Sequence, residues 1–152
     1  MSVESVREFF TTRNLPDPIT IISESGATVD LAAKILGVNP ELIAKTLAFR
    51  LKDKDILIVT SGNKKIDNRK YRDYFKTKAK MLNHEEVFEI TGHPVGGVCP
   101  FGLKTNIDIY IDMSLKDFDY VYPAAGSAYS IMKISPGEMQ KLTNASWANI
   151  CV

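Results

Sequence analysis

The sequence contains few of the residues from which disulfides, metal centres and membrane spans are built. Its 152 residues include only two histidines and two cysteines, and the cysteines, Cys99 and Cys151, lie far apart. This usage predicts neither a disulfide nor a metal site, and it is typical of the reducing cytoplasm, where we expect the protein to reside. No apolar run approaches the roughly 20 residues that cross a bilayer, and residues 1–4 do not open a secretory signal.

Several cofactor and hydrolase motifs are also absent. The sequence has no P-loop, no G-x-G-x-x-G after a strand, no G-x-S-x-G and no H-E-x-x-H. Phosphate-cofactor, dinucleotide and zinc-protease chemistry therefore lose their main support. We expect a protein that needs no cofactor and no metal, and that has neither a membrane nor DNA as its partner.

Cap residues, turn residues and hydrophobic periodicity predict a series of short elements. Strands are expected at 20–22, 46–51, 56–59, 107–112, 120–122 and 130–134. Helices are expected at 3–12 and 28–36, and from caps at Asp67, Asn83 and Ser135. Residues 46–60 read as a hairpin, and the pattern favours antiparallel-style pairs. The length suits one core, so we expect residues 1–152 to form a single α+β domain.

The segment from Gly92 to Gly102 holds four glycines and two prolines in eleven residues. Such a stretch is neither regular helix nor central strand, because glycine is too permissive and proline lacks the N–H donor. It is also apolar, with His93 as its one titratable residue besides Cys99. A loop of this kind is either a tight turn or a surface of bare backbone N–H groups that holds an oxyanion or a carbonyl.

Two further positions are candidates for binding. Lys45 follows a short helix and stands among apolar residues, so its side chain either extends to the surface or points into a pocket, where burial would lower its pKa. The small residues at 124–127 interrupt two strands. They form either a hairpin turn or the floor of a cleft, with Ser127 as a hydrogen-bonding group.

Positive charge is concentrated in one stretch. The formal net charge is +1, yet residues 64–80 contain eight Lys or Arg against two Asp. The stretch is either a solvated helix face or a footprint for a polyanion, in which Lys64, Lys65 and Arg69 would contact RNA.

Cys99 raises a separate hypothesis, a thiol-dependent hydrolase with His84 or His93 as the base. Nothing around the cysteine matches a nucleophile signature, and a loop cysteine is more often a small apolar residue.

Five short sequence segments occur in an order that is typical of one protein family. They are an Ala-Ala-x-x-Leu-Gly-Val helix at 32–38, Ile43–Leu47, a Gly-x-x-x-Pro loop at 96–100, Ala125-Gly126-Ser127, and a Ser-Pro-x-x-Met helix start at 135–139. Together they resemble the YbaK/ProX family of aminoacyl-tRNA deacylases, the free-standing relatives of the editing domain of bacterial prolyl-tRNA synthetase. The resemblance spans about residues 20–143.

This resemblance implies a single α+β domain with a curved, barrel-like mixed sheet and surrounding helices. It implies hydrolysis, without a metal, of the ester that joins a wrong amino acid to tRNA. The implied substrates are cysteinyl- or alanyl-tRNA, on the tRNA for proline, with prolyl-tRNA synthetase as a candidate partner. A non-catalytic module that binds aminoacyl-adenosine or tRNA beside a synthetase is the alternative, because no general base is evident.

The resemblance also implies roles for individual residues. Lys45 would position the substrate, and Gly96 and Gly97 would present backbone N–H groups to the ester carbonyl or to the attacking group. The residues expected to bind substrate are Thr28, Thr46, Pro100, Phe101, Gly126 and Ser127.

Overall fold

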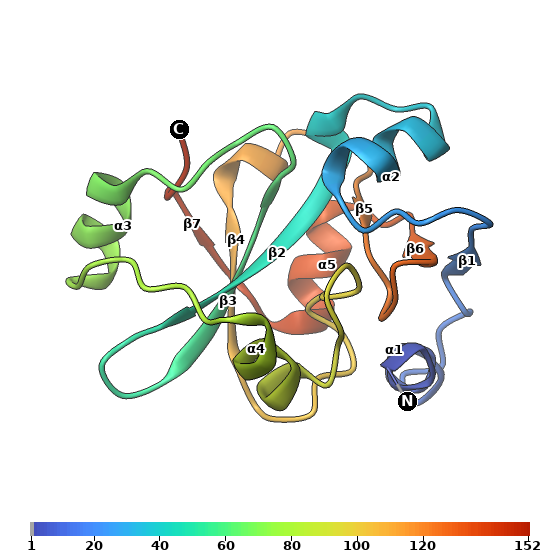
Figure 1. Cartoon of the computed structure of the whole chain (residues 1–152), viewed down its shortest axis with the longest axis horizontal. Helices are drawn as coiled ribbons and strands as arrows, with labels where there is room; N and C mark the ends of the chain where they lie inside the picture. The colour runs from blue at the N-terminus through green and yellow to red at the C-terminus, as the bar shows by residue number, and fades with distance from the viewer. Residues whose placement is uncertain (1) are drawn as a thin grey trace.

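The computed structural model describes residues 2–152 and consists of a mixed β-sheet with helices on both faces (Figure 1). The helices are α1 (Ser2–Thr11), α2 (Val29–Leu36), α3 (Asn68–Phe75), α4 (His84–Thr91) and α5 (Pro136–Thr143), with 3₁₀ turns at Pro40–Leu42 and Met113–Leu115. The strands are β1 (Ile19–Ile21), β2 (Ile43–Arg50), β3 (Asp55–Ser61), β4 (Asp108–Asp112), β5 (Tyr122–Pro123), β6 (Ser130–Met132) and β7 (Ser146–Ala148). The α+β prediction is confirmed.

Local capping sets where the helices begin. At each of four starts a side chain accepts a hydrogen bond from the backbone N–H three residues on, as the sequence predicts. The pairs are Thr28 with Leu31, Asp67 with Lys70, Asn83 with Glu86, and Ser135 with Glu138. Asn83 and Glu86 complete a reciprocal capping box. These caps fix where the preceding loops end and the helices begin.

Strand pairing differs from the sequence prediction. The main sheet has the order β5-β2-β3-β4-β7, and only β2–β3 within it is antiparallel; β2–β5, β3–β4 and β4–β7 are parallel. The expectation of antiparallel-style pairs is therefore right for the hairpin, for β1–β6 and for the bridges that join residues 121–124 to 131–134, and wrong for the three parallel pairs. Strand β7 is not among the expected strands, and β2 begins at Ile43, so Lys45 lies within the strand.

Two isolated β-bridges connect the main sheet to the β1–β6 pair. Ala124 pairs with Ile131, and Val121 pairs with Ile134. These bridges join the β5 and β6 segments, so the small β1–β6 ribbon continues the curve of the main sheet. The curved mixed sheet that the resemblance implies is thus confirmed.

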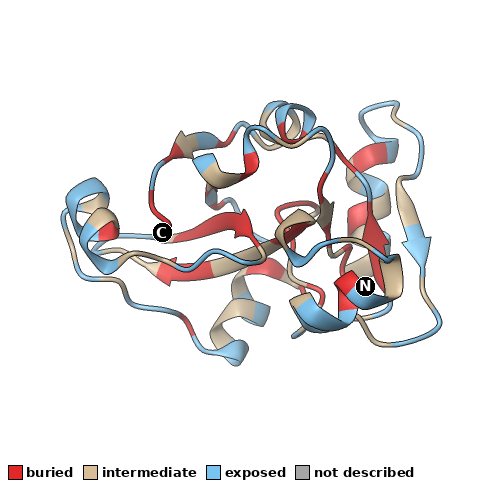
Figure 2. Cartoon of the chain, turned by 90° about the horizontal axis from the view of Figure 1, so that it is seen from above, coloured by how far each residue is buried: buried red, intermediate tan, exposed pale blue. Residues whose placement is uncertain are grey.

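Alternation along the strands separates two cores. One face carries Ala44 and Ala48 of β2 and packs against α1, α4 and α5. The other face carries Phe49 and packs against α3 through Tyr71. Seen from above, the buried residues run along the strands and the exposed residues lie on the outer helices and loops (Figure 2).

Helix α1 rests directly on two loop glycines. A Cβ on Gly102 would lie 2.5 Å from the carbonyl oxygen of Ser5, and a Cβ on Gly126 would lie 2.8 Å from that of Ser2. The Ser2 hydroxyl is also hydrogen-bonded to Nδ1 of the buried His93. The helix therefore forms the rear support of the 93–102 loop and of the 124–128 turn.

Candidate active site at the open edge of strand β2

Part of the β2 edge away from β3 is left uncovered. β5 pairs with this edge at Ile43 and Ala44. Farther along, the Leu82 N–H donates to Ala48 (3.0 Å), and the Arg50 N–H donates to Lys80 (2.8 Å). Between these contacts the alternation of the strand directs the backbone N–H and C=O of Thr46 to the same edge. No backbone partner meets them there within residues 2–152. An edge of this kind can hydrogen-bond a bound ligand.

A cavity of about 260 Å³ lies at this opening. Its wall is mostly apolar, as is usual for small-molecule sites. The polar side chains in the wall are Thr28, Lys45, Thr46, His84, Tyr122 and Ser130. Gly96 of the glycine loop and Ala128 of the 124–128 turn complete the wall. Three of the segments singled out in the sequence therefore meet in one hollow.

Lys45 lines this cavity, and its ammonium group is bonded to the backbone of the turn after β3. Nζ donates to the carbonyl oxygen of Lys64 (2.6 Å) and more weakly to that of Gly62 (3.4 Å). Burial lowers the pKa of Lys45; the nearby Cys151 opposes this shift and Lys65 adds to it. An ammonium group has three donors, so one N–H remains for a ligand. Of the two alternatives for Lys45, the pocket is the one observed.

Thr46 presents an unusual hydroxyl. Its Oγ1 is buried and has no hydrogen-bond partner among the described residues, a condition shared only with the Tyr71 hydroxyl. A buried hydroxyl without a partner costs about 1–3 kcal/mol. Because Thr46 lines the cavity, a ligand there is a natural partner for this atom.

The glycine loop approaches its neighbours too closely for a side chain. A Cβ on Gly97 would lie 2.4 Å from the backbone nitrogen of Ser127, and a Cβ on Gly96 would lie 2.9 Å from the Cβ of Ala27. The loop is further fixed by the Gly126 N–H, which donates to the Gly97 carbonyl (3.0 Å). The two loops and the start of α2 thus form one packed wall.

The backbone donors of this loop are not those expected. The Gly97 N–H donates to the Pro94 carbonyl (2.9 Å) and closes a turn. Gly97 therefore cannot offer this group to a substrate. The N–H groups of Gly96 and Val98 have no backbone partner within residues 2–152, and both residues line the cavity. The donor that the sequence assigned to Gly97 is instead available from Val98.

Ser127, in the turn of small residues, has a structural role. Ser127 Oγ is hydrogen-bonded to Ser130 Oγ (2.9 Å) and accepts from the Tyr129 N–H (3.1 Å). Ser130, not Ser127, lines the cavity. The Thr28 hydroxyl also has a structural part, since it accepts from Leu31 at the start of α2 (3.2 Å). The sequence analysis did not predict that Ser130 and His84 line the cavity. The available signals were the position of Ser130 in a buried strand and the position of His84 at the start of a helix.

Besides Ser127, three more of the expected substrate-binding residues, Pro100, Phe101 and Gly126, lie outside this cavity. Phe101 is fully buried, and its ring packs 5.2 Å from that of Phe10 and 5.4 Å from that of Phe9. Pro100 lines a different hollow, described below.

The residues expected to contact RNA are on the surface. Lys64 and Lys65 lie exposed in the turn after β3, and Arg69 lies exposed in the first turn of α3.

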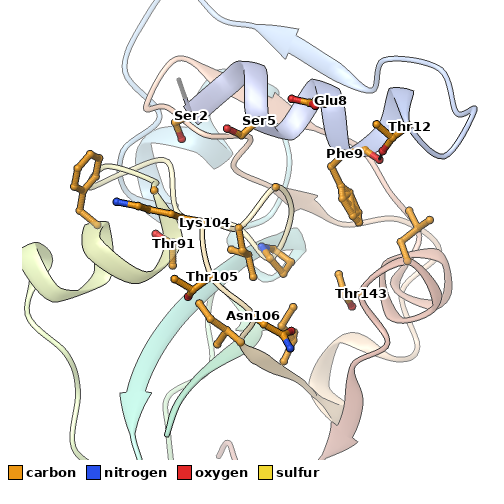
Figure 3. A pocket seen from close by; sticks show the side chains of 18 of the residues that line it. Ser2, Ser5, Glu8, Phe9, Thr12, Thr91, Lys104, Thr105, Asn106 and Thr143 are labelled. Atoms are coloured by element: carbon orange, nitrogen blue, oxygen red, sulfur yellow. Dashed lines mark hydrogen bonds between the residues drawn. The ribbon is translucent and has the colours of Figure 1, made fainter.

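A larger hollow of about 940 Å³ lies between α1, residues 100–107 and α5 (Figure 3). Two of its hydroxyls are already committed to nearby backbone. Thr91 donates to Val87 (2.7 Å), and Thr105 donates to Ile90 (2.8 Å). With these groups engaged, this hollow offers less chemistry than the smaller cavity.

Cys99 is poorly placed to be a nucleophile. It is fully buried outside both hollows, and burial raises the pKa of its thiol to about 12. Nε2 of His93 lies 3.6 Å from Sγ, but it also bonds the Phe101 carbonyl (2.7 Å). A thiolate is the reactive form of cysteine, so this environment opposes the thiol hypothesis.

Two further features are absent from residues 2–152. No cluster of three or more His, Cys, Asp and Glu side chains in this range is arranged to hold a metal ion. No helix in it has the length and apolar character needed to cross a lipid bilayer.

The sequence model of the aminoacyl-tRNA editing domain matches residues 23–142. The chain belongs to this family. The matched range contains every residue that lines the cavity at β2 except Ile22, and it confirms the resemblance drawn from the sequence.

Individual relatives place the editing domain in two settings. The chain is 46% identical to the uncharacterized protein YwhH of Bacillus subtilis (strain 168), over 99% of this chain and 98% of that one. It is 26% identical to an Enterococcus faecalis protein named "Putative Cys-tRNA(Pro)/Cys-tRNA(Cys) deacylase EbsC", over 84% of this chain and 79% of that one. It is 29% identical to the proline–tRNA ligase of Bacillus pumilus, over 72% of this chain but only 20% of that enzyme.

A solved structure agrees with the editing-domain fold. The chain superposes with a TM-score of 0.90 on a crystal structure described as "a putative trans-editing enzyme for prolyl tRNA synthetase". The two sequences are 28% identical, and the match covers 98% of this chain and 96% of the other.

Proposed function

We propose that the protein is a trans-editing hydrolase that cleaves the ester between a wrong amino acid and tRNA. The observation that carries this proposal is that Lys45 and Thr46, neighbours on β2, meet the distant Gly96 in one cavity. Membership of the editing-domain family supports the same chemistry.

The cavity suits a small aminoacyl group. Its volume of about 260 Å³ and its apolar wall leave room for a short side chain and part of the ribose. Larger amino acids are excluded by size, as in the second sieve of a double-sieve scheme.

Two kinds of hydrogen-bond donor act on the ester: backbone N–H groups polarise its carbonyl, and Lys45 orients it. The Gly96 and Val98 N–H groups face the carbonyl oxygen and stabilise the negative charge that develops on it. Loss of one donor of this kind typically costs about 2.7–4 kcal/mol in the transition state. The remaining Lys45 N–H holds the 3′-terminal ribose or phosphate, which orients the ester against these donors.

Water completes the reaction. Its oxygen bonds to the carbonyl carbon and gives up a proton, the bond from that carbon to the ribose oxygen breaks, and the ribose oxygen takes up that proton. The products are the free amino acid and uncharged tRNA. An aminoacyl ester is already activated, so orientation and charge stabilisation suffice without a metal.

The names of the relatives support a proposal for the substrate and the partner. EbsC is named for cysteinyl-tRNA, and the ligase relatives are named for proline. We propose cysteinyl- or alanyl-tRNA, on the tRNA for proline, as the substrate and prolyl-tRNA synthetase as a partner. We also propose that Lys64, Lys65 and Arg69 contact the tRNA. Their charge reversal should weaken tRNA binding and reduce its salt dependence.

A binding module without catalysis is the second candidate, and one observation favours it. No Asp or Glu of the described residues lines the cavity, which leaves Lys45, His84 and Tyr122 as its titratable side chains. Such a module would hold aminoacyl-adenosine without hydrolysing it.

A deacylation panel separates the two candidates. The purified protein is incubated with tRNA for proline charged separately with Cys, Ala, Ser, Thr and Pro, with Lys45→Ala and Lys141→Ala variants beside it. We expect loss of the cysteinyl or alanyl ester with the native protein and with Lys141→Ala, but not with Lys45→Ala. Binding of an aminoacyl-adenosine analogue without hydrolysis of any ester would favour the binding module.

A further inference from the structure

Three lysines follow α3 at alternate positions, Lys76, Lys78 and Lys80, and all three are exposed. The residues between them, Thr77 and Ala79, are half-buried, and Ala79 packs against the core under α3. Lys76 itself is the left-handed C-cap of α3, so the extended stretch begins after it. Within that stretch the alternation places Lys78 and Lys80 on one side, about 7 Å apart along the chain. The result is a row of three ammonium groups on a supported segment.

The row leads to the cavity at β2. Residues 80–82 run antiparallel to the end of β2, with Lys80 bonded to Arg50, Met81 bridged to Phe49 and Leu82 bonded to Ala48. Met81 and Leu82 then line the cavity, and the Met81 side chain is exposed at 59%. Lys80 is therefore the member of the row nearest the opening, and Lys76 is the farthest.

The charges of the row are free to act on a ligand. No described carboxylate forms an ion pair with any of the three lysines. The acids beside the row, Asp55 and Glu86, are both paired with Arg50 (2.9 and 2.7 Å). Lys70 of the same stretch is less available, since it donates to the carbonyl oxygen of Cys151 (2.8 Å).

We propose that Lys76, Lys78 and Lys80 bind successive phosphates of a single-stranded RNA 3′ end and guide its terminal nucleoside into the cavity at β2. The inference rests on the proposed function for the identity of the RNA, because the unpaired 3′ end of tRNA carries the ester. A row of point charges reads the phosphate backbone and not the bases. The row therefore supplies affinity for any 3′ overhang and leaves the choice of amino acid to the cavity.

The test compares a triple variant, Lys76→Gln/Lys78→Gln/Lys80→Gln, with a matched control, Lys104→Gln/Lys133→Gln/Lys141→Gln, whose lysines are also exposed but lie elsewhere. Each protein is titrated by fluorescence anisotropy with an uncharged RNA hairpin that has a four-nucleotide 3′ overhang, and with the same hairpin made blunt. We expect the row variant to bind the overhang RNA at least tenfold more weakly. The slope of log affinity against log salt concentration should fall by about 2, near 0.7 for each phosphate that the row no longer neutralises. The control should stay within twofold of the native protein.

Two results would overturn the proposal: unchanged affinity of the row variant, or an equal loss on blunt and overhang RNA. A second assay keeps the failure of this proposal distinct from failure of the proposed function. Hydrolysis of a cysteinyl or alanyl ester of adenosine, which has no phosphates, should be the same for the row variant and the native protein. If the native protein hydrolyses no such ester, the proposed function fails, while the RNA titration still decides the role of the row.

Discussion

The ammonium nitrogen of Lys45 lies 2.6 Å from the carbonyl oxygen of Lys64, which follows the end of β3. This contact orients the side chain along the cavity wall without neutralising its charge, because a carbonyl is an uncharged acceptor. Burial lowers the pKa of the half-buried Lys45, and its carbonyl partners add no counter-charge.

Replacing this lysine should remove activity and keep the fold. We expect Lys45→Ala to lower kcat/KM for aminoacyl-tRNA hydrolysis by at least about 100-fold, the effect of removing about one well-placed donor, because the ester loses its orienting group. The melting temperature should change by only a few degrees, since the two missing hydrogen bonds contribute about 0.5–1.5 kcal/mol each. Undiminished turnover by a folded Lys45→Ala protein would show that the lysine does not act on the substrate.

Two glycines, one in the glycine loop and one in α5, offer substitutions with opposite expected signs. Gly97→Ala places a methyl group 2.4 Å from the Ser127 backbone. It should lower the free energy of unfolding by about 2 kcal/mol or more. A Cβ on Gly137 meets nothing within 4 Å. Gly137→Ala should therefore raise the unfolding free energy by up to about 1 kcal/mol. Denaturant titrations of both variants provide the comparison, and equal effects would mean that the loop does not pack as described.

Thr46 can be examined through the difference between the free and the ligand-bound protein. Thr46→Val keeps the shape and removes a buried hydroxyl that has no partner among the described residues. We expect the stability of the free protein to be unchanged or higher. Affinity for an aminoacyl-adenosine analogue should fall by about 1 kcal/mol. Calorimetry and thermal melts measure both quantities, and a clear loss of stability in the free protein would mean that the hydroxyl already has a partner.

His93 should make stability depend on pH. Burial lowers the pKa of the imidazole, although the hydrogen bond to Phe101 acts in the opposite direction. The unfolded chain then binds more protons than the folded chain once the pH falls through the ordinary value of 6.5. The unfolding free energy should accordingly fall as the pH is lowered from about 7 to about 5. His93→Gln should flatten this slope, whereas His84→Gln, at an exposed position, should keep it. An unchanged slope in His93→Gln would assign the effect to another group.

Activity should not depend on the buried thiol. Since burial raises the pKa of Cys99 to about 12, almost no thiolate is present near neutral pH. We expect Cys99→Ala to keep at least half of the native kcat/KM, with thermal melts controlling for the core position. A loss comparable to that of Lys45→Ala would restore the thiol hypothesis.

Sequence signals were strong where they were local. The caps at Thr28, Asp67, Asn83 and Ser135 are formed within three residues of each cap, so the sequence predicts the helix starts correctly. Strand pairing is set by contacts between distant segments, and β3–β4 and β4–β7 are parallel in spite of the antiparallel expectation. Strand β7 has only three residues, too few to show a period.

The same distinction applies to the cavity. Lys45 and Gly96 could be singled out because residue type and loop composition mark them. The open edge beside Thr46 could not, because it depends on where β5 and residues 80–82 stop pairing with β2. Phe101 was misplaced for a similar reason, since its burial depends on α1, far away in the sequence.

Helix α1 lies outside the range that matches the editing-domain family, yet the glycine loop and the 124–128 turn pack against it. An editing domain inserted into a synthetase can keep the same cavity only if the host enzyme provides an equivalent surface behind these loops. In this protein α1 supplies that surface. Transplanting residues 23–142 alone into another enzyme should therefore yield a site whose rear wall has to be redesigned.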